Sequence, residues 1–453
     1  MLIKREIYHK ILNWKKQCNG EKALLIEGAR RTGKSTIVEQ FAKNEYKSYI
    51  FVDFSKASKR IKDCFDDLTN LDVFFQTMSL EYNTRLYPRK SLVIFDEIQK
   101  FPKAREAIKH LVADGRYDYI ETGSLISLKE NVCNILIPSE ERKLKMYPVS
   151  FWEFMNYMNE ELLLDYITQC YKDKKPLEQK FHTKAMRLFK EYLLVGGMPQ
   201  VLVAYKESGR DFAFADSEKR DILNLYRDDI KKAAKRYNSR VSAIFENIPA
   251  YLSTHEKRIV LNTVEKGATF HQYDDPLFWL NDSMICNLCY KCNDPNVGFA
   301  LNKNESFVKC YLGDTGLLVS LAFSENELTT NNLYKQIMED KLSLNEGMIY
   351  ENMISQMLTA AGKKLFFYTR YSEEKHRNDI EIDFMISNDS KTKFKIIPIE
   401  VKSSKNYTSI SLNKFYSSFS RKIAQSYIIH PKNLFIDEKI IRIPPYMLPL
   451  ILS

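Results

Sequence analysis

One stretch of thirteen residues constrains the fold of this chain more than any other. It runs from Leu24 to Thr36 and reads LLIEGARRTGKST, an apolar run followed by the spacing G-x-x-x-x-G-K-S. The apolar run is typical of a buried strand, and the IVEQFA that follows is typical of a helix. A glycine-rich turn between a strand and a helix is the setting that a phosphate-binding loop requires. The stretch therefore predicts a strand, a phosphate-binding turn and a helix.

Each part of this turn has a physical role in holding a polyphosphate. Gly28 and Gly33 let the backbone come close to the anion, and the backbone N–H groups and the helix N-terminus then face it. We expect Lys34 to reach the β- and γ-phosphates of ATP and Ser35 to ligate Mg²⁺. The predicted nucleotide-binding residues are contiguous in the sequence: Gly28, Ala29, Arg30, Arg31, Thr32, Gly33, Lys34, Ser35 and Thr36.

A second apolar run, SLVIFDE at residues 91–97, ends in two carboxylates. Asp96 is expected to hold Mg²⁺, directly or through water, and Glu97 to act as the general base that polarises the attacking water. A strand that merely ends in a polar turn is the alternative. The position of Asp96 and Glu97, sixty residues after a phosphate loop, favours the catalytic interpretation.

Strands and helices alternate along this part of the chain, which predicts a parallel sheet covered on both faces. The expected elements are helices at 4–18, 60–86 and 104–112 and further strands at 48–53 and 117–124. Thr122 and Ser124 stand at the end of the last of these strands. A hydroxyl at Thr122 or Ser124 is interpreted either as a group that orients the hydrolytic water or senses the γ-phosphate, or as a helix cap.

Composition sets the broad class of the protein. The 453 residues predict two to four domains. The net charge is +10, and the first sixty residues hold 14 Lys and Arg against 6 Asp and Glu. Such a surplus suits a polyanion, with a solvated basic face as the alternative. No apolar run approaches the ~18 residues of a membrane span and the N-terminus lacks a signal-peptide core, so we expect a cytoplasmic protein without a membrane partner.

The middle of the chain is predicted to be mainly helical. Ser150 and Glu153 have the spacing of a capping box, residues 151–195 read as largely helical, and GGMP at 196–199 breaks the run. Short helices follow at 245–252, 256–265 and 276–282, before an expected strand at 283–290.

Cys286, Cys289 and Cys292 lie on that strand, and its alternation favours reduced core cysteines over metal ligands.

A second set of charged residues lies near the C-terminal end. Glu351 is on an expected helix, Asp383 is on an expected strand at 380–386, and Glu400 and Lys402 share one face of the next strand. Two carboxylates and a lysine on one sheet face can bind Mg²⁺ and stabilise a phosphodiester transition state, so Asp383 and Glu400 are predicted ligands of a second metal site. A salt-bridged hairpin is the alternative.

Seven motifs give the chain a resemblance to a known family. They are GARRTGKST, LVIFDEIQK, TGS, KMYPVSFWEF, GGMPQVLV, EIDFMI at 381–386 and IPIEVKSS at 397–404. The chain resembles, over nearly its whole length, bacterial and archaeal AAA-type ATPases whose C-terminal part is a domain of unknown function, DUF4143. The C-terminal charged residues resemble the PD-(D/E)XK nuclease fold, with Glu351 matching the carboxylate of its first helix. Ile382 stands where that motif has its proline.

The resemblance implies an α/β fold with five parallel strands, a helical lid, a winged-helix-like middle and a nuclease-like end. The corresponding domains would be 1–210, 211–333 and 334–453. It implies ATP hydrolysis with Mg²⁺, coupled to DNA binding or processing. The alternative is an ATP-dependent signalling or scaffold switch with an inactive C-terminal domain that binds a protein. ATP, DNA and further copies of the chain are the candidate partners.

The resemblance also places a catalytic arginine before YPVSF, where Arg142 stands. In AAA-type ATPases such an arginine often completes the site of a neighbouring subunit. Arg105 and Arg116 are the rival candidates.

Overall fold

The computed structural model describes residues 3–124, 137–234, 237–259, 270–325, 330–339, 345–374, 376–388 and 395–452. The chain divides into two compact units. The first comprises residues 1–147 and 282–284, and the second comprises 148–281 and 285–453. The predicted domain boundaries after residues 210 and 333 both fall inside the second unit, and the three-domain division stays a prediction.

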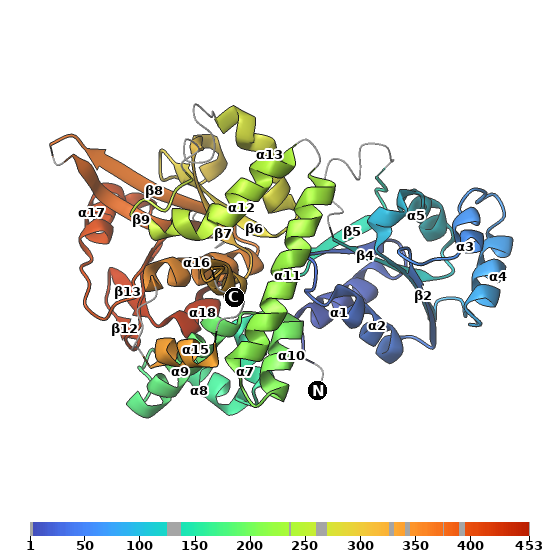
Figure 1. The fold of residues 1–453 in the computed structure, drawn as a ribbon, viewed down its shortest axis with the longest axis horizontal. Helices are drawn as coiled ribbons and strands as arrows, with labels where there is room; N and C mark the ends of the chain where they lie inside the picture. Colours follow the sequence, from blue (N-terminus) through green and yellow to red (C-terminus); the bar gives the residue numbers. More distant parts are fainter. Residues whose placement is uncertain are drawn as a thin grey trace. The chain divides into compact units, whose positions relative to one another are not determined.

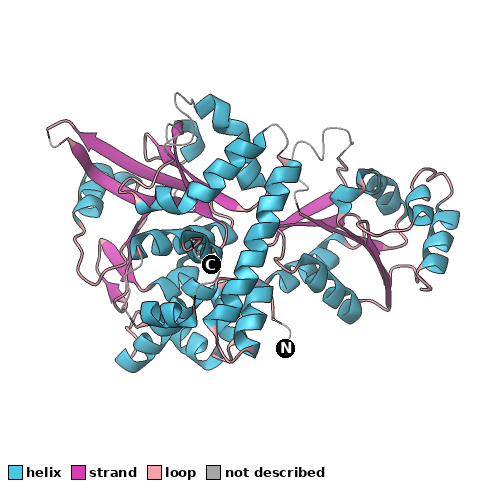
Figure 2. Ribbon diagram, in the orientation of Figure 1, coloured by secondary structure: helices cyan, strands magenta, loops and turns pink. Residues whose placement is uncertain are grey.

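The first unit is built on a five-stranded sheet (Figure 1, Figure 2). Every strand pair in it is parallel, and the spatial order is β2-β3-β4-β1-β5. The strands are β1 (Ala23–Glu27), β2 (Ser48–Asp53), β3 (Ser91–Asp96), β4 (Asp118–Gly123) and β5 (Glu141–Lys145). The parallel five-stranded sheet that we expected is therefore confirmed.

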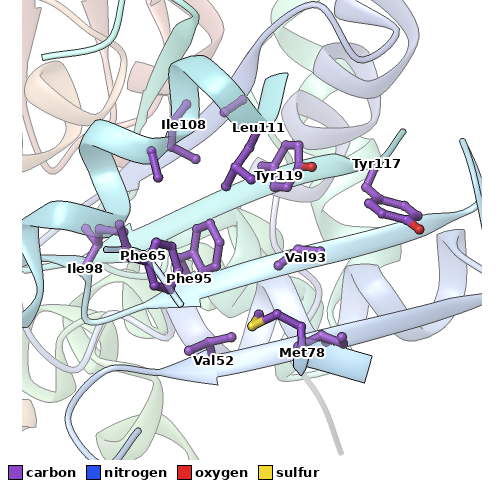
Figure 3. Close-up of a cluster of buried hydrophobic side chains, with 14 of the residues drawn as sticks. Val52, Phe65, Met78, Val93, Phe95, Ile98, Ile108, Leu111, Tyr117 and Tyr119 are labelled. Atoms are coloured by element: carbon purple, nitrogen blue, oxygen red, sulfur yellow. The ribbon is translucent and has the colours of Figure 1, made fainter. Parts of the chain in front are cut away.

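Helices cover both faces of this sheet, which explains why β1 and β3 are apolar at almost every position. Leu24 and Ile94 belong to a core shared with α1 (Ile7–Cys18) and α2 (Lys34–Glu45). Leu25 and Val93 belong to the core on the other face, shared with α3 (Lys59–Asp63), α4 (Leu71–Glu81) and α5 (Pro102–Asp114). Figure 3 shows part of that second core, with Val93 on β3, which lies between β2 and β4. Alternate residues of the same strand thus pack against helices on opposite faces of the sheet.

The position of the fifth strand, β5, was not located by the sequence pattern. Four of its five residues are charged, and it pairs only with β1, at the edge of the sheet. Most of its side chains are exposed or half-buried, so it carries no apolar alternation that a pattern could detect. Arg142 consequently lies inside a strand.

The second unit begins with helices. The capping box at Ser150 and Glu153 is present, with both reciprocal hydrogen bonds. The predicted break at residues 196–199 is confirmed between α9 and α10. The predicted helix at 256–265 is wrong for residues 256–259, and 260–265 lie outside the described residues. The helices are α7 (Phe151–Tyr157), α8 (Glu161–Lys172), α9 (Gln179–Val195), α10 (Pro199–Glu207), α11 (Phe212–Ala233), α12 (Asn238–Ser253) and α13 (Phe270–Asp282).

A mixed eight-stranded sheet forms the rest of the second unit, in the order β12-β13-β11-β10-β9-β8-β6-β7. The expected hairpin of β9 and β10 is antiparallel, and its turn at 389–394 lies outside the described residues. The strands are β6 (Cys286–Cys292), β7 (Lys303–Leu312), β8 (Leu365–Ser372), β9 (Arg377–Asn388), β10 (Lys395–Val401), β11 (Ser426–Ile429), β12 (Phe435–Ile436) and β13 (Ile440–Ile443).

The strand pair of the middle segment continues into this sheet. β6 pairs antiparallel with β7 and parallel with β8. The predicted strand is present, and the winged-helix-like arrangement of the middle segment stays a prediction. The seven cysteines among the described residues are free, and Cys286, Cys289 and Cys292 are buried, as expected of core cysteines.

Five further α-helices of the second unit lie within the described ranges. Leu412 and Phe415 of α17 pack on the eight-stranded sheet in a core with Ile382 and Ile428. Among the described helices, none combines the length and the apolar character needed to cross a bilayer. The further helices are α14 (Thr315–Ala322), α15 (Asn331–Met338), α16 (Glu346–Ala360), α17 (Ile410–Phe419) and α18 (Leu448–Leu452).

Candidate functional site

The phosphate loop lies between the carboxyl end of β1 and the first residue of α2. Gly33 has φ +91° and precedes Lys34, where the helix begins. A Cβ at Gly28 would lie 2.5 Å from the carbonyl oxygen of Met146, so a side chain has no room there. The Thr32 hydroxyl donates to the Ala29 carbonyl at 2.9 Å and closes the turn from inside. Both glycines of the motif are therefore required by local geometry.

An arginine that the sequence reasoning did not single out supports this loop. Arg5 donates to the carbonyl oxygen of Thr32 at 3.0 Å and to that of Tyr147 at 2.7 Å. The two carbonyls are 27 and 142 residues away from it along the chain. No local pattern signals such a contact.

Lys34 is buried, with 7% of its surface exposed. Its ammonium donates to the carbonyls of Gly28 and Ala29, both at 2.9 Å. Burial lowers the pKa of Lys34 to about 8, against the opposing pull of the Glu97 and Asp96 carboxylates. The lysine is thus folded back over the loop, with its charge only partly compensated.

Asp96 connects three elements of the site. Its carboxylate accepts hydrogen bonds from Ser35 Oγ, at 2.9 and 3.0 Å to the two oxygens, and from Thr122 Oγ1. Burial raises the pKa of Asp96. The carboxyl ends of β1, β3 and β4 therefore meet where the sequence places the nucleotide, as parallel α/β sheets place their ligands.

Glu97 and Ser124 complete this edge of the sheet. Glu97 has the left-handed φ of +54° immediately after β3, and its carboxylate accepts from Gln99 Nε2 at 2.5 Å. Ser124 is 1% exposed, and its hydroxyl has no hydrogen-bond partner among the described residues. The predicted cap concerns the residues after Ser124, and residues 125–136 lie outside the described residues. Both interpretations of Ser124 therefore stay open.

Arg142 lies away from the phosphate loop of its own chain. It is level with Leu24 near the start of β5, whereas the loop follows the carboxyl end of β1, and it donates to Gln17 Oε1 at 2.9 Å. The rival Arg105 forms a buried two-pronged pair with Glu141 at 2.9 and 3.0 Å. Action of Arg142 on a neighbouring subunit stays a prediction.

In the C-terminal cluster, Glu351 is neutralised by lysines. Its carboxylate is paired with Lys257, lies 3.6 Å from Lys309 Nζ and accepts from the Tyr311 hydroxyl at 3.0 Å. Asp383 accepts from the backbone N–H of Val401 at 2.8 Å. Burial and the Glu351 charge raise the pKa of Asp383 to about 7. The charge of Glu351 is therefore compensated from within the chain, whereas a charge on Asp383 is not fully compensated.

Glu400 and Lys402 form the remaining part of this cluster, an ion pair at 2.7 Å that confirms their shared face. Burial raises the pKa of Glu400. Among the described residues no three acidic, histidine or cysteine side chains are gathered so that they could hold a metal ion. The second metal site at Asp383 and Glu400 stays a prediction.

Three family models match parts of the sequence. Residues 20–155 match an AAA domain, 186–328 match the domain of unknown function DUF8612, and 346–446 match the domain of unknown function DUF4143. No curated protein matches the chain.

Solved structures show only distant likeness. The Walker-type ATPase PABY2304 of Pyrococcus abyssi is 14% identical, with 71% of this chain and 96% of that one covered and a TM-score of 0.41. The ORC1 protein of Aeropyrum pernix in complex with DNA is 12% identical, with 72% and 93% covered and a TM-score of 0.29. The Pif1 helicase of Candida albicans is 14% identical, with 41% and 47% covered and a TM-score of 0.23. All three scores lie below 0.5, so nothing about this chain follows from them.

The AAA family model covers the phosphate loop, both carboxylates after β3 and the hydroxyls after β4. These are the residues that the parallel sheet brings to one edge. The chain therefore carries an AAA domain of the P-loop ATPase class, followed by a DUF8612 segment and a C-terminal DUF4143 domain.

Proposed function

We propose that the AAA domain binds ATP with Mg²⁺ and hydrolyses it at the phosphate loop. The observation that carries this proposal is the contact of Ser35 Oγ with both oxygens of Asp96, beside the buried ammonium of Lys34. A hydroxyl and a carboxylate are the oxygen ligands that Mg²⁺ takes in proteins, and a nearby lysine suits the phosphates. The donor set therefore fits a magnesium nucleotide.

Each residue of the site has a separate role in the proposed hydrolysis. Bound Mg²⁺ supplies neutralisation of phosphate charge, and Ser35 and Asp96 would hold it. Lys34 gives up the two loop carbonyls that it contacts here and turns its ammonium to the phosphate oxygens. Glu97, oriented by Gln99, accepts the proton of the attacking water. The hydroxyl of Ser124, which has no partner in the described part of the chain, has a hydrogen bond to give to the same region.

Hydrolysis by the purified full chain tests this proposal. Lys34→Ala should abolish binding of a fluorescent ATP analogue, or reduce hydrolysis by about 10²–10³-fold as the loss of a transition-state donor does. Lys109→Ala, an exposed lysine of α5, is the matched control and should hydrolyse ATP at the wild-type rate. Wild-type hydrolysis by Lys34→Ala would refute the assignment.

We further propose that the ATPase is coupled to nucleic acid. The support is the net charge of +10 and the basic surplus of the first sixty residues. Coupling predicts that added DNA changes the rate of ATP hydrolysis and that the effect weakens steeply with salt. A rate that DNA leaves unchanged at every salt concentration would contradict it.

A specific observation supports the alternative, a switch whose C-terminal domain binds a partner without cleaving nucleic acid. Lys257 and Lys309 already neutralise Glu351, so this carboxylate is held without a divalent ion. Mn²⁺ calorimetry on the full chain distinguishes a nuclease-like C-terminal domain from a partner-binding one. Metal uptake that disappears in the Asp383→Asn, Glu400→Gln double variant would favour the nuclease-like reading, and the absence of uptake would favour the switch.

A further inference from the structure

A hollow of about 520 Å³ lies beside the edge strand β2 of the first unit. Strand β2 pairs on one side with β3 only, so the other side of the strand is open. The hollow is formed by the end of α2, by β2 and by the segment after α4. Its lining residues are Lys43, Tyr46, Lys47, Ser48, Tyr49, Ile50, Phe51, Tyr82 and Thr84.

The lining combines aromatic rings with positive charge. Four of the nine side chains are aromatic, two are lysines, and none is acidic. Both lysines are exposed. Lys43 pairs with Glu39 at 2.7 Å, outside the lining, so Lys47 carries the less compensated charge. The Lys47 ammonium lies 3.7 Å from the ring centre of Tyr87, whose segment also bears Arg85, Arg89 and Lys90.

This hollow is separate from the nucleotide site. Ser48, at the start of β2, is level with Ser91, at the start of β3. Asp53, at the other end of β2, is level with Asp96 of the nucleotide site. The hollow therefore borders the amino-terminal half of the strand, whereas the phosphate loop serves the carboxyl edge of the sheet. A ligand in it and ATP would not compete for the same groups.

We propose that this hollow binds single-stranded nucleic acid, with bases on the half-buried rings of Tyr49, Phe51 and Tyr82 and phosphates at the lysines, whereas the buried Tyr46 only supports the wall. Single strands are held by a combination of stacking surfaces and positive charge, since every base has a ring face and every link a phosphate. The carboxylate of Glu39 lies at the margin, where it accepts from the Tyr49 hydroxyl at 3.2 Å and is paired with Lys43. An acidic peptide would use the lysines but not the half-buried ring faces. The inference rests on the proposed coupling to nucleic acid and gives that coupling a site.

Fluorescence anisotropy of a labelled fifteen-nucleotide oligothymidylate with the full chain is the test. Lys47→Glu should weaken binding at least tenfold, and Lys47→Gln should reduce the slope of log affinity against log salt by about 0.7, the value for one single-strand phosphate contact. Tyr49→Leu, which keeps apolar packing, should weaken binding about tenfold with little change in that slope. Lys109→Glu, an exposed lysine outside the hollow, should bind like the wild type. Saturating ATP analogue should not displace the oligonucleotide.

The outcomes separate this inference from the coupling on which it rests. Oligonucleotide binding that is equal in the wild type, Lys47→Glu and Tyr49→Leu would leave the coupling standing and overturn this site. The absence of binding to any nucleic acid would overturn both. Equal binding of polyglutamate, lost in the same variants, would assign the hollow to acidic peptides instead. Unchanged ATP hydrolysis without DNA in each variant shows that the first unit is folded.

Discussion

Asp96 shows how one buried carboxylate can organise a site. Its hydroxyl partners come from the start of α2 and from β4, 61 and 26 residues away in the sequence. A buried carboxylate is costly unless hydrogen bonds or a cation compensate it. In this chain two hydroxyls supply the hydrogen bonds, and they keep the carboxylate beside the phosphate loop. The same arrangement that stabilises the free protein thus prepares it for a cation.

Replacement of Glu97 tests the proposed division of labour at this site. Glu97→Gln keeps an oxygen that can accept the hydrogen bond of Gln99 but removes the proton acceptor for water. We expect ATP to stay bound while single-turnover hydrolysis falls by about 10²–10⁴-fold. Filter retention of labelled ATP and the rate of phosphate release measure the two effects separately. Glu21→Gln, an exposed residue before β1, is the control, and wild-type turnover by Glu97→Gln would exclude Glu97 as the base.

His430 should make the stability of the second unit depend on pH. It is 2% exposed, and its ring contacts the Tyr407 hydroxyl at 2.8 Å and the Asn433 carbonyl at 3.3 Å. Burial lowers the pKa of His430 from 6.5 to about 4. Between these values the unfolded chain binds a proton that the folded chain rejects, so the free energy of unfolding falls as the pH drops from 6.5 to 4.

The expected loss from His430 is on the order of 3 kcal/mol, most of it by pH 4.5. Urea unfolding at pH 7 and pH 4.5 measures it, and His430→Gln should have a smaller difference between the two pH values than the wild type. The exposed His9 provides the control in His9→Gln, which should keep the full difference. Equal differences in His430→Gln and the wild type would show that His430 does not titrate as proposed.

At the scale of elements, the break between α9 and α10 is fixed by close backbone contact with α14. Asp314 caps α14 through the N–H of Leu317 at 3.0 Å, and its other oxygen accepts from the N–H of Gly197 at 2.6 Å. A Cβ on Gly316 would lie 2.3 Å from the carbonyl oxygen of Val195 and 2.6 Å from the Cα of Gly196. Only glycine allows this approach, because the neighbouring atoms are backbone and cannot move aside.

Gly316→Ala should therefore destabilise the second unit by about 1–3 kcal/mol, the usual cost of overpacking. Chemical denaturation followed by fluorescence measures the change. Gly347→Ala is the matched control, since no atom would lie closer to its Cβ than 3.5 Å and alanine favours helix α16. A loss in Gly347→Ala equal to that in Gly316→Ala would mean that contact with α9 is not the cause.

The predictability of each element follows from how local its signal is. Strands β1 and β3 were predictable because burial on both faces makes them continuous apolar runs. The edge strand β5 has mostly exposed or half-buried charged residues and pairs on one side only, so nothing in its own sequence marks it as a strand. The sequence predicts a strand where β6 lies. It does not predict that β6 belongs to the C-terminal sheet, because its partner β8 is far from it in the sequence.

The same distinction separates the two candidate sites. Lys34, Ser35 and Asp96 come together as expected because a motif of fixed spacing and a strand end specify them. The surroundings of Glu351 depend on Tyr311, 40 residues away, and on Lys257, 94 residues away, and neither belongs to a motif. Residue types alone therefore indicated a carboxylate cluster but not the lysines that neutralise it.

At the scale of the whole molecule, the proposed nucleotide-site residues described above all lie within one of two compact units. The phosphate loop, Asp96 and Ser124 belong to the first unit, and the DUF4143 match belongs to the second. A chain with separate cores need not unfold in a single step. A ligand stabilises only the part of a protein whose folded form it binds.

ATP with Mg²⁺ should accordingly protect one unit more than the other. At a free ATP concentration about a hundred times its Kd, linkage predicts close to 2.7 kcal/mol of added stability for the first unit. Hydrogen exchange read by mass spectrometry should show slower exchange in peptides from β1, α2 and β3, with little change in peptides from β9 to β13. The Lys34→Ala variant, measured under the same conditions, should lose the protection of the first unit. Equal protection of both units by ATP would contradict this prediction and would indicate that nucleotide binding and the folding of the DUF4143 domain are coupled.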